Sequence, residues 1–186
     1  MSEMRLLENP AEAFIKEFTD SPVALISPNS INWNSRVALE IKNLMSYIDY
    51  LKSVPNSLWF FLKPCTDKQY NFQRWDGFLK IPTRPDIQFE LRIVLTSEYP
   101  YVFPRAFAEE SIKDYCAGNI FPKNIWQDSD NDTKKFVMIC HDHMKELQAW
   151  NPGLSLTHFL VREVWYWWMS KINRIIFEWD KKKLGL

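Results

Sequence analysis

The segment at residues 87–95 constrains the fold of this chain most strongly. In Ile87-Gln-Phe-Glu-Leu-Arg-Ile-Val-Leu95 every odd-numbered residue is apolar. Successive side chains of a β-strand point to opposite faces, so a period of two places the whole apolar set on one face. The pattern therefore predicts a strand that packs one face on a hydrophobic core.

Helices and further strands are predicted on both sides of this segment. Apolar residues recur every three or four positions over 35–51 and again over 155–180, which is the period of a helix with one buried face. Ser155 or Thr157 can cap the start of the second helix. Three more strands are predicted at 58–63, 75–81 and 105–108. The sequence thus predicts an α+β fold: a helix, a four-stranded antiparallel meander, a long irregular loop at 109–153 and a C-terminal helix.

Composition limits the class of protein. A chain of 186 residues with 46% hydrophobic and 25% charged residues suits one globular domain. We place this domain at residues 29–186, after an N-terminal extension at 1–28. Lys plus Arg equals Asp plus Glu at 23 each, so no net field attracts nucleic acid or an anionic membrane. The chain has no Gly-x-Gly or Gly-Lys-Ser pattern, so we expect no nucleotide and no other cofactor.

The cysteines and the apolar stretches indicate the compartment. Cys65, Cys116 and Cys140 form no Cys-x-x-Cys pair and leave one cysteine over in any pairing, which fits a reducing cytosol. The most apolar stretch, residues 159–169, is too short to cross a bilayer. The first residues also lack the pattern of a signal peptide. We therefore expect a cytoplasmic protein.

One dense set of reactive side chains lies in the predicted loop: Cys140-His141-Asp142-His143. The residues alone leave three interpretations open. Cys140 ends a short apolar run and can simply be buried, as free cysteines often are. It can belong to a metal site that Cys116 completes, but the separated ligand pairs of structural zinc are missing, so we expect no metal. It can also be the nucleophile of a Cys-His hydrolase.

Three short patterns follow one another in a particular order. The strand at 87–95 leads into Tyr99-Pro-Tyr-Val-Phe-Pro104, Ile139-Cys140 follows an irregular stretch, and Trp150-Asn-Pro152 precedes a helix. Over residues 35–180 the chain resembles the ubiquitin-conjugating enzymes, as a divergent member with their Tyr-Pro-x-x-x-Pro turn, active-site Ile-Cys and Trp-x-Pro. Its Ile-Cys-His-Asp-His-Met is similar to Ile-Cys-Leu-Thr-Asp-His in the conjugating enzyme of the ubiquitin-fold modifier. The resemblance implies a UBC-like fold and is compatible with a bacterial or other non-eukaryotic ubiquitin-like pathway.

The resemblance implies a transferase with protein partners. Cys140 would accept a ubiquitin-like modifier as a thioester from an activating enzyme and pass it to an amine or a thiol, and a deconjugating peptidase would belong to the same pathway. Most family members have His-Pro-Asn before the cysteine, where the Asn supports the isopeptide step. The nearest match here is Phe121-Pro-Lys-Asn124, so Asn124 is a weak candidate for this role, and the pattern favours a turn residue. Structural support for the active-site loop is expected from Tyr99, Pro100, Pro104, Trp150 and Pro152.

The chemistry of transfer suggests roles for the neighbours of Cys140. A thiolate is both a nucleophile and a good leaving group, which suits an acyl carrier. A lysine acceptor, with a pKa of about 10.4, must lose a proton before it attacks. Asp142 and His143 are candidates to orient the amine and accept that proton, and His141 is a second choice. Each can instead be a solvated loop residue, and the alternative functions are an inactive binding module of the same fold or the Cys-His hydrolase.

Overall fold

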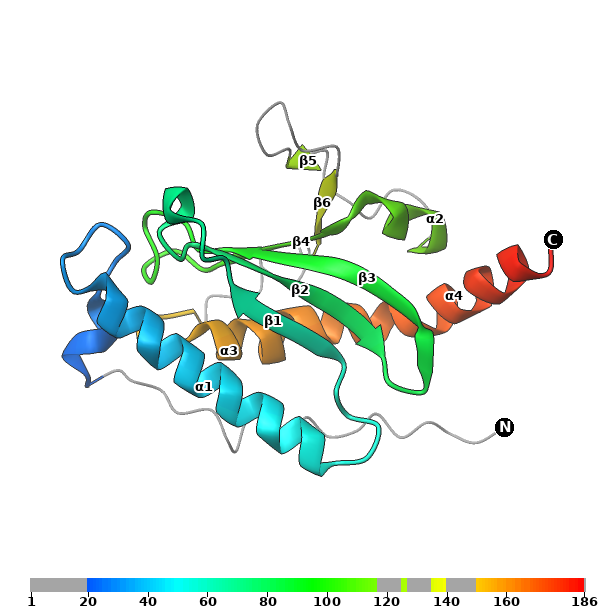
Figure 1. Cartoon of the computed structure of the whole chain (residues 1–186), viewed down its shortest axis with the longest axis horizontal. Coiled ribbons are helices and arrows are strands. Elements are labelled where there is room, and N and C mark those ends of the chain that lie inside the picture. Colours follow the sequence, from blue (N-terminus) through cyan, green and yellow to red (C-terminus); the bar gives the residue numbers. More distant parts are fainter. Residues whose placement is uncertain (1–19, 117–124, 127–134, 140–149, 186) are drawn as a thin grey trace.

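The alternating segment forms the longest strand of an antiparallel sheet. In the computed structural model, which describes residues 20–116, 125–126, 135–139 and 150–185, β3 (Arg84–Val94) pairs with β2 on one side and β4 on the other. The six strands lie in the order β1-β2-β3-β4-β6-β5 (Figure 1). The remaining strands are β1 (Phe60–Pro64), β2 (Arg74–Ile81), β4 (Arg105–Glu109), β5 (Ile125–Trp126) and β6 (Phe136–Ile139). The predicted combination of helices with an antiparallel sheet is confirmed.

The two predicted helices are present and longer than the patterns indicated. Helix α1 (Trp33–Ser53) contains the segment at 35–51. At the C-terminus, α3 (Leu156–Phe159), a π-helical turn (Leu160–Val164) and α4 (Trp165–Lys183) follow one another without a break. Ser155 caps this helix, because its hydroxyl accepts a hydrogen bond from the backbone N–H of His158. The remaining helical pieces are α2 (Lys113–Cys116) and three short turns at Pro22–Leu25, Lys68–Tyr70 and Glu110–Ile112.

The hydrophobic core lies between one face of the sheet and the two long helices. The odd-numbered residues of β3 from Ile87 to Ile93 are at most 2% exposed. They belong to one cluster with buried side chains of α1 and of the C-terminal helix, such as Leu44 and Trp168. Figure 1 shows both helices along the sheet. A smaller cluster, Phe107, Phe136 and Met138, forms on the opposite face.

The prediction of four strands and an irregular loop at 109–153 was wrong in part. Residues 136–139 form β6, which pairs with β4, and β5 pairs with β6. All four side chains of β6 are buried. Val137 and Ile139 join the main core, whereas Phe136 and Met138 join the smaller cluster. Because both faces are covered, this short strand shows no alternation, and its sequence looks like any short apolar run.

Candidate functional site

The two described ends of the 140–149 stretch lie at the same end of the sheet. Ile139 closes β6 and pairs with Ala106, which is the second residue of β4. The turn at 96–104 leads directly into that strand. On the other side of the stretch, the indole Nε1 of Trp150 donates a hydrogen bond of 2.8 Å to the Pro100 carbonyl oxygen in this turn. The chain therefore enters and leaves the stretch beside the Tyr-Pro turn.

The predicted site residues divide into two groups. The proposed chemical groups Cys140, His141, Asp142, His143 and Asn124 lie outside the described residues, as does the acidic segment at 128–132. The five predicted supporting residues lie within them. Tyr99, Pro100 and Pro104 are buried, and Trp150 and Pro152 are half-buried. The ring centroids of Tyr99 and Trp150 are 6.3 Å apart, so the turn and the start of the Trp150 segment pack together.

A buried ion pair in α1 anchors this end of the sheet. Arg36 Nε lies 2.7 Å from Glu40 Oε1, and both side chains are 0% exposed. The Tyr99 hydroxyl donates to Glu40 Oε1 and accepts from Arg36 Nη2 at 2.9 Å. Burial and the Glu40 charge raise the pKa of Tyr99 well above its usual value of about 10, so the hydroxyl keeps its proton and remains a donor.

The same ion pair holds backbone groups from two other segments. Arg36 Nη2 donates to the Leu154 carbonyl oxygen at 2.8 Å, and Arg36 Nη1 donates to the carbonyl oxygen of Ala24. Glu40 Oε2 accepts from the backbone N–H of Leu156 at 2.9 Å. A carboxylate at the first turn of a helix satisfies a free N–H group and interacts favourably with the helix dipole. Three segments that are distant in sequence, at 21–26, 96–104 and 152–156, are thus fixed to α1.

Sequence reasoning missed Arg36 and Glu40, although a signal for them exists. Both fall on the buried face of α1, at helical spacing from Trp33 and Leu44. A charged residue within an apolar stripe is rarely buried unless it is paired. An Arg and a Glu four positions apart on that stripe can form such a pair. The apolar period alone identified the helix but did not identify its buried charges.

β6 is also fixed from its other face. The guanidinium of Arg92, a residue only 5% exposed, lies 4.1 Å from the ring centroid of Phe136 in β6. Arg92 Nε also lies 2.7 Å from Asp76 Oδ1 in β2. A cation over an aromatic ring and an ion pair at one guanidinium hold the side chain in place. The strand that leads to Ile139 is therefore supported by both clusters.

The start of the C-terminal helix contains a buried histidine. His158 is 1% exposed, and its Nδ1 accepts a hydrogen bond of 3.0 Å from the backbone N–H of Ser155. Its Nδ1 also lies 2.8 Å from the Ser155 hydroxyl. Burial, followed by the positive charges of Arg162 and Arg36, lowers the pKa of His158 to about 3. The ring is therefore neutral at neutral pH, and its unprotonated Nδ1 completes the capping box.

His158 should make the stability of the fold depend on pH. Its pKa in the folded state, about 3, lies below the unfolded value of about 6.5, so the unfolded chain binds the proton first. The stability is complete above pH ~6.5 and should fall by up to about 1.4 kcal/mol per pH unit below it. His158→Asn, whose amide oxygen can accept the same N–H, should flatten this slope between pH ~6.5 and ~4.5 in urea unfolding experiments. An unchanged slope in the variant would assign the effect to other groups.

The two other cysteines lie in different environments. Cys116 is 3% exposed in the main core, and burial raises the pKa of its thiol to about 11, which keeps it protonated and unreactive. Cys65 is half-buried after β1.

Across the residues that the structure describes, no three His, Cys, Asp or Glu side chains gather as a metal site. No helix in this part of the chain is long and apolar enough to span a membrane.

Neither a scan against models of known protein families nor a search of curated proteins finds a match to this chain.

Proposed function

We propose that the protein is a conjugating enzyme that carries a ubiquitin-like modifier as a thioester on Cys140. The proposal is supported by the order of sequence patterns that resembles the ubiquitin-conjugating enzymes. The observation that carries it is that Ile139 pairs with the start of β4, the strand that directly follows the Tyr-Pro turn, and that Trp150 donates a hydrogen bond to this turn. The Tyr-Pro turn and the Trp-x-Pro segment, two of the patterns that resemble the family, therefore lie together at one end of the antiparallel sheet.

Charging is a thiol exchange. The Cys140 thiolate attacks the carbonyl carbon of the modifier's thioester on the activating enzyme, a new C–S bond forms, and the old C–S bond breaks to release the enzyme's thiolate. The two sulfurs are chemically alike, so alignment by the activating enzyme can supply most of the catalysis. In discharge a lysine nitrogen attacks the same carbonyl carbon, a C–N bond replaces the C–S bond, and the amine proton passes to a base.

The test is a charging assay with the wild-type chain. It is mixed with a ubiquitin-like modifier, its activating enzyme and ATP, and run on a gel with and without a thiol. The expected product is a covalent adduct that the thiol cleaves and that maps to the peptide containing Cys140. Binding of the modifier without an adduct would instead indicate an inactive binding module. Cleavage of a conjugate without any charged intermediate from the activating enzyme would indicate a hydrolase.

Replacement of Asp142 or His143 with alanine should separate the two steps. Charging should stay nearly unchanged, because thiol exchange needs no base for an amine. Discharge to free lysine should slow by about ten- to a thousandfold, the range typical of general-base losses, in a single-turnover assay. Higher pH should partly restore discharge, because more lysine is then already deprotonated. Equal loss in both steps would point to a loop that has lost its shape.

A further inference from the structure

A surface hollow lies between the end of α1 and the β2–β3 hairpin. It encloses about 430 Å³, a volume within the usual range of ligand sites. Its floor is apolar, since Leu51 and Ile81 are 5% and 2% exposed. Exposed prolines, Pro55 and Pro85, form part of its rim. Such a hollow can hold one or two apolar side chains of a partner.

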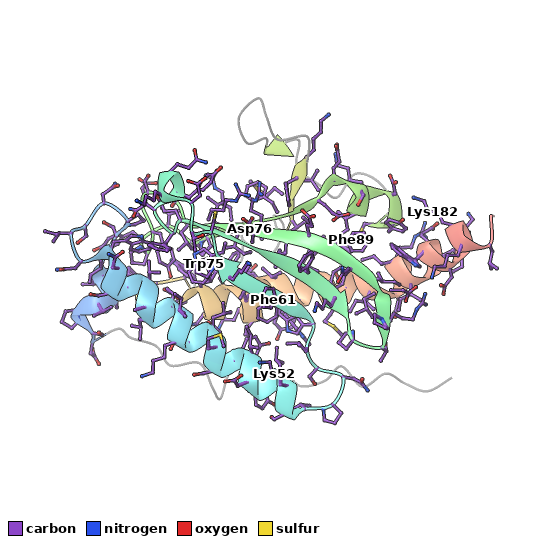
Figure 2. The ribbon with its side chains drawn as sticks, viewed as in Figure 1. Lys52, Phe61, Trp75, Asp76, Phe89 and Lys182 are labelled. Atoms are coloured by element: carbon purple, nitrogen blue, oxygen red, sulfur yellow. The ribbon has the colours of Figure 1, made fainter. Side chains whose placement is uncertain are left out.

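The charges that line this hollow have one sign. Lys52 and Lys80 are its only charged lining residues. Lys52, labelled at the end of α1 in Figure 2, has its Nζ 3.3 Å from an oxygen of Asp49. It also lies in the last turn of the helix, where a cation offsets the negative end of the helix dipole. Within the described part of the chain, Lys80 makes no ion pair with a carboxylate. Lys80 therefore contributes a positive charge that no carboxylate of the described residues balances.

The position of Lys80 is well defined. Its carbonyl oxygen accepts a hydrogen bond of 3.0 Å from Trp168 Nε1 in α4. It pairs with Gln88 in β3, which also lines the hollow. The backbone of Lys80 is thus fixed at the edge of a hollow that Leu51 and Ile81 also line.

The hollow is distant from Ile139, the last described residue before Cys140 in the sequence. Ile139 lies in register with Trp75 through Ala106 and Ile93, at the far end of β2 from Ile81. Trp75 and Ile81 are six positions apart in β2, which at about 3.3 Å per residue is roughly 20 Å. A ligand in the hollow would therefore lie at the opposite end of the sheet from Ile139.

We propose that this hollow binds the carboxyl-terminal residue of a partner protein, with an apolar last side chain. A terminal residue presents an apolar side chain and a carboxylate together, which matches an apolar floor beside one unbalanced ammonium. Charge complementarity identifies the partner: a carboxylate meets Lys80, and the side chain covers Leu51 and Ile81. The inference does not depend on the thioester chemistry.

The test uses two peptides and the full chain labelled with nitrogen-15. The first peptide is acetyl-Gly-Ser-Leu-Phe with a free carboxylate, and the second has the same sequence with a terminal amide. The free acid should give saturable amide shifts centred on 54–58 and 80–88, and the amide should bind at least threefold more weakly. Lys80→Gln should weaken the acid about two- to fivefold, as for one exposed ion pair, and Lys80→Arg should retain its affinity. Lys80→Glu should remove the preference for the acid.

Lys63→Glu is the matched control, because this exposed lysine of β1 does not line the hollow. It should leave the preference for the free acid unchanged. If Lys63→Glu lost the preference for the free acid as fully as Lys80→Glu does, the preference would depend only on the overall charge of the protein, and the proposed site would be wrong. Equal affinity for the two peptides, or no saturable shift at millimolar peptide, would also overturn it. An unchanged spectrum elsewhere in each variant verifies that it is folded.

Discussion

Replacing Cys140 with alanine is expected to abolish charging by the activating enzyme, because the variant has no atom at that position that can accept the acyl group. Cys140→Ser should still be acylated, since a hydroxyl oxygen can attack the same carbonyl carbon. Its product should be an oxygen ester that resists thiols, because an alkoxide is a poorer leaving group than a thiolate. A gel run with and without a thiol distinguishes the two products.

The other two cysteines provide matched controls for this experiment. Cys116 lies in the core with a pKa raised to about 11, and Cys65 belongs to no recognisable motif. Serine at either position should leave charging intact in protein that remains folded. If a folded Cys65 or Cys116 variant lost charging, or if Cys140→Ala still formed the adduct, Cys140 would not be the nucleophile.

Replacing Glu40 with alanine should lower the free energy of unfolding by about 3–5 kcal/mol, which is typical when one partner of a buried ion pair is removed. The variant leaves the Arg36 guanidinium buried without its counter-charge. It also leaves the backbone N–H of Leu156 and the Tyr99 hydroxyl without their acceptor. Since small domains are stable by about 5–15 kcal/mol, much of the stability would be lost. Chemical unfolding measures the change.

Two further variants separate the ion pair from general damage to the core. Arg36→Met combined with Glu40→Leu leaves no unpaired charge buried and should recover part of the loss. The recovery should be incomplete, because the backbone groups of Ala24, Leu154 and Leu156 lose their side-chain partners. Asp180→Ala removes one partner of a partly exposed pair with Arg84, which keeps Asp86 as its other partner, and should have little effect. A Glu40→Ala protein as stable as the wild type would contradict the assigned role of the pair.

The sequence predicts those elements that have one buried and one exposed face. The strand at 87–95 and the helices at 35–51 and 155–180 each show their period because polar residues alternate with apolar ones. β6 has no exposed face, so its four residues carry no period at all. The pairing of Ala106 with Ile139 also cannot be predicted from the local sequence, because strand register depends on contacts between distant segments.

The candidate site was predicted from residue order rather than from geometry. Tyr99, Pro100 and Trp150 could be named from their patterns, but the hydrogen bond from Trp150 to Pro100 could not. Arg36 and Glu40 were missed because the helix was identified from its apolar residues alone. A helical wheel of residues 33–53 places both charged side chains on the apolar face, which is the sign of a buried ion pair.

The Arg36 contacts also bear on how the chain is made. Arg36 and Leu154 are 118 positions apart, and synthesis proceeds from the N-terminus. A nascent chain therefore exposes α1 and the Tyr-Pro turn long before Leu154 and Leu156 emerge. Until then the Arg36 and Glu40 side chains lack their last backbone partners, and water must take those places. This end of the sheet can thus be completed only after the residues up to Leu156 have left the ribosome.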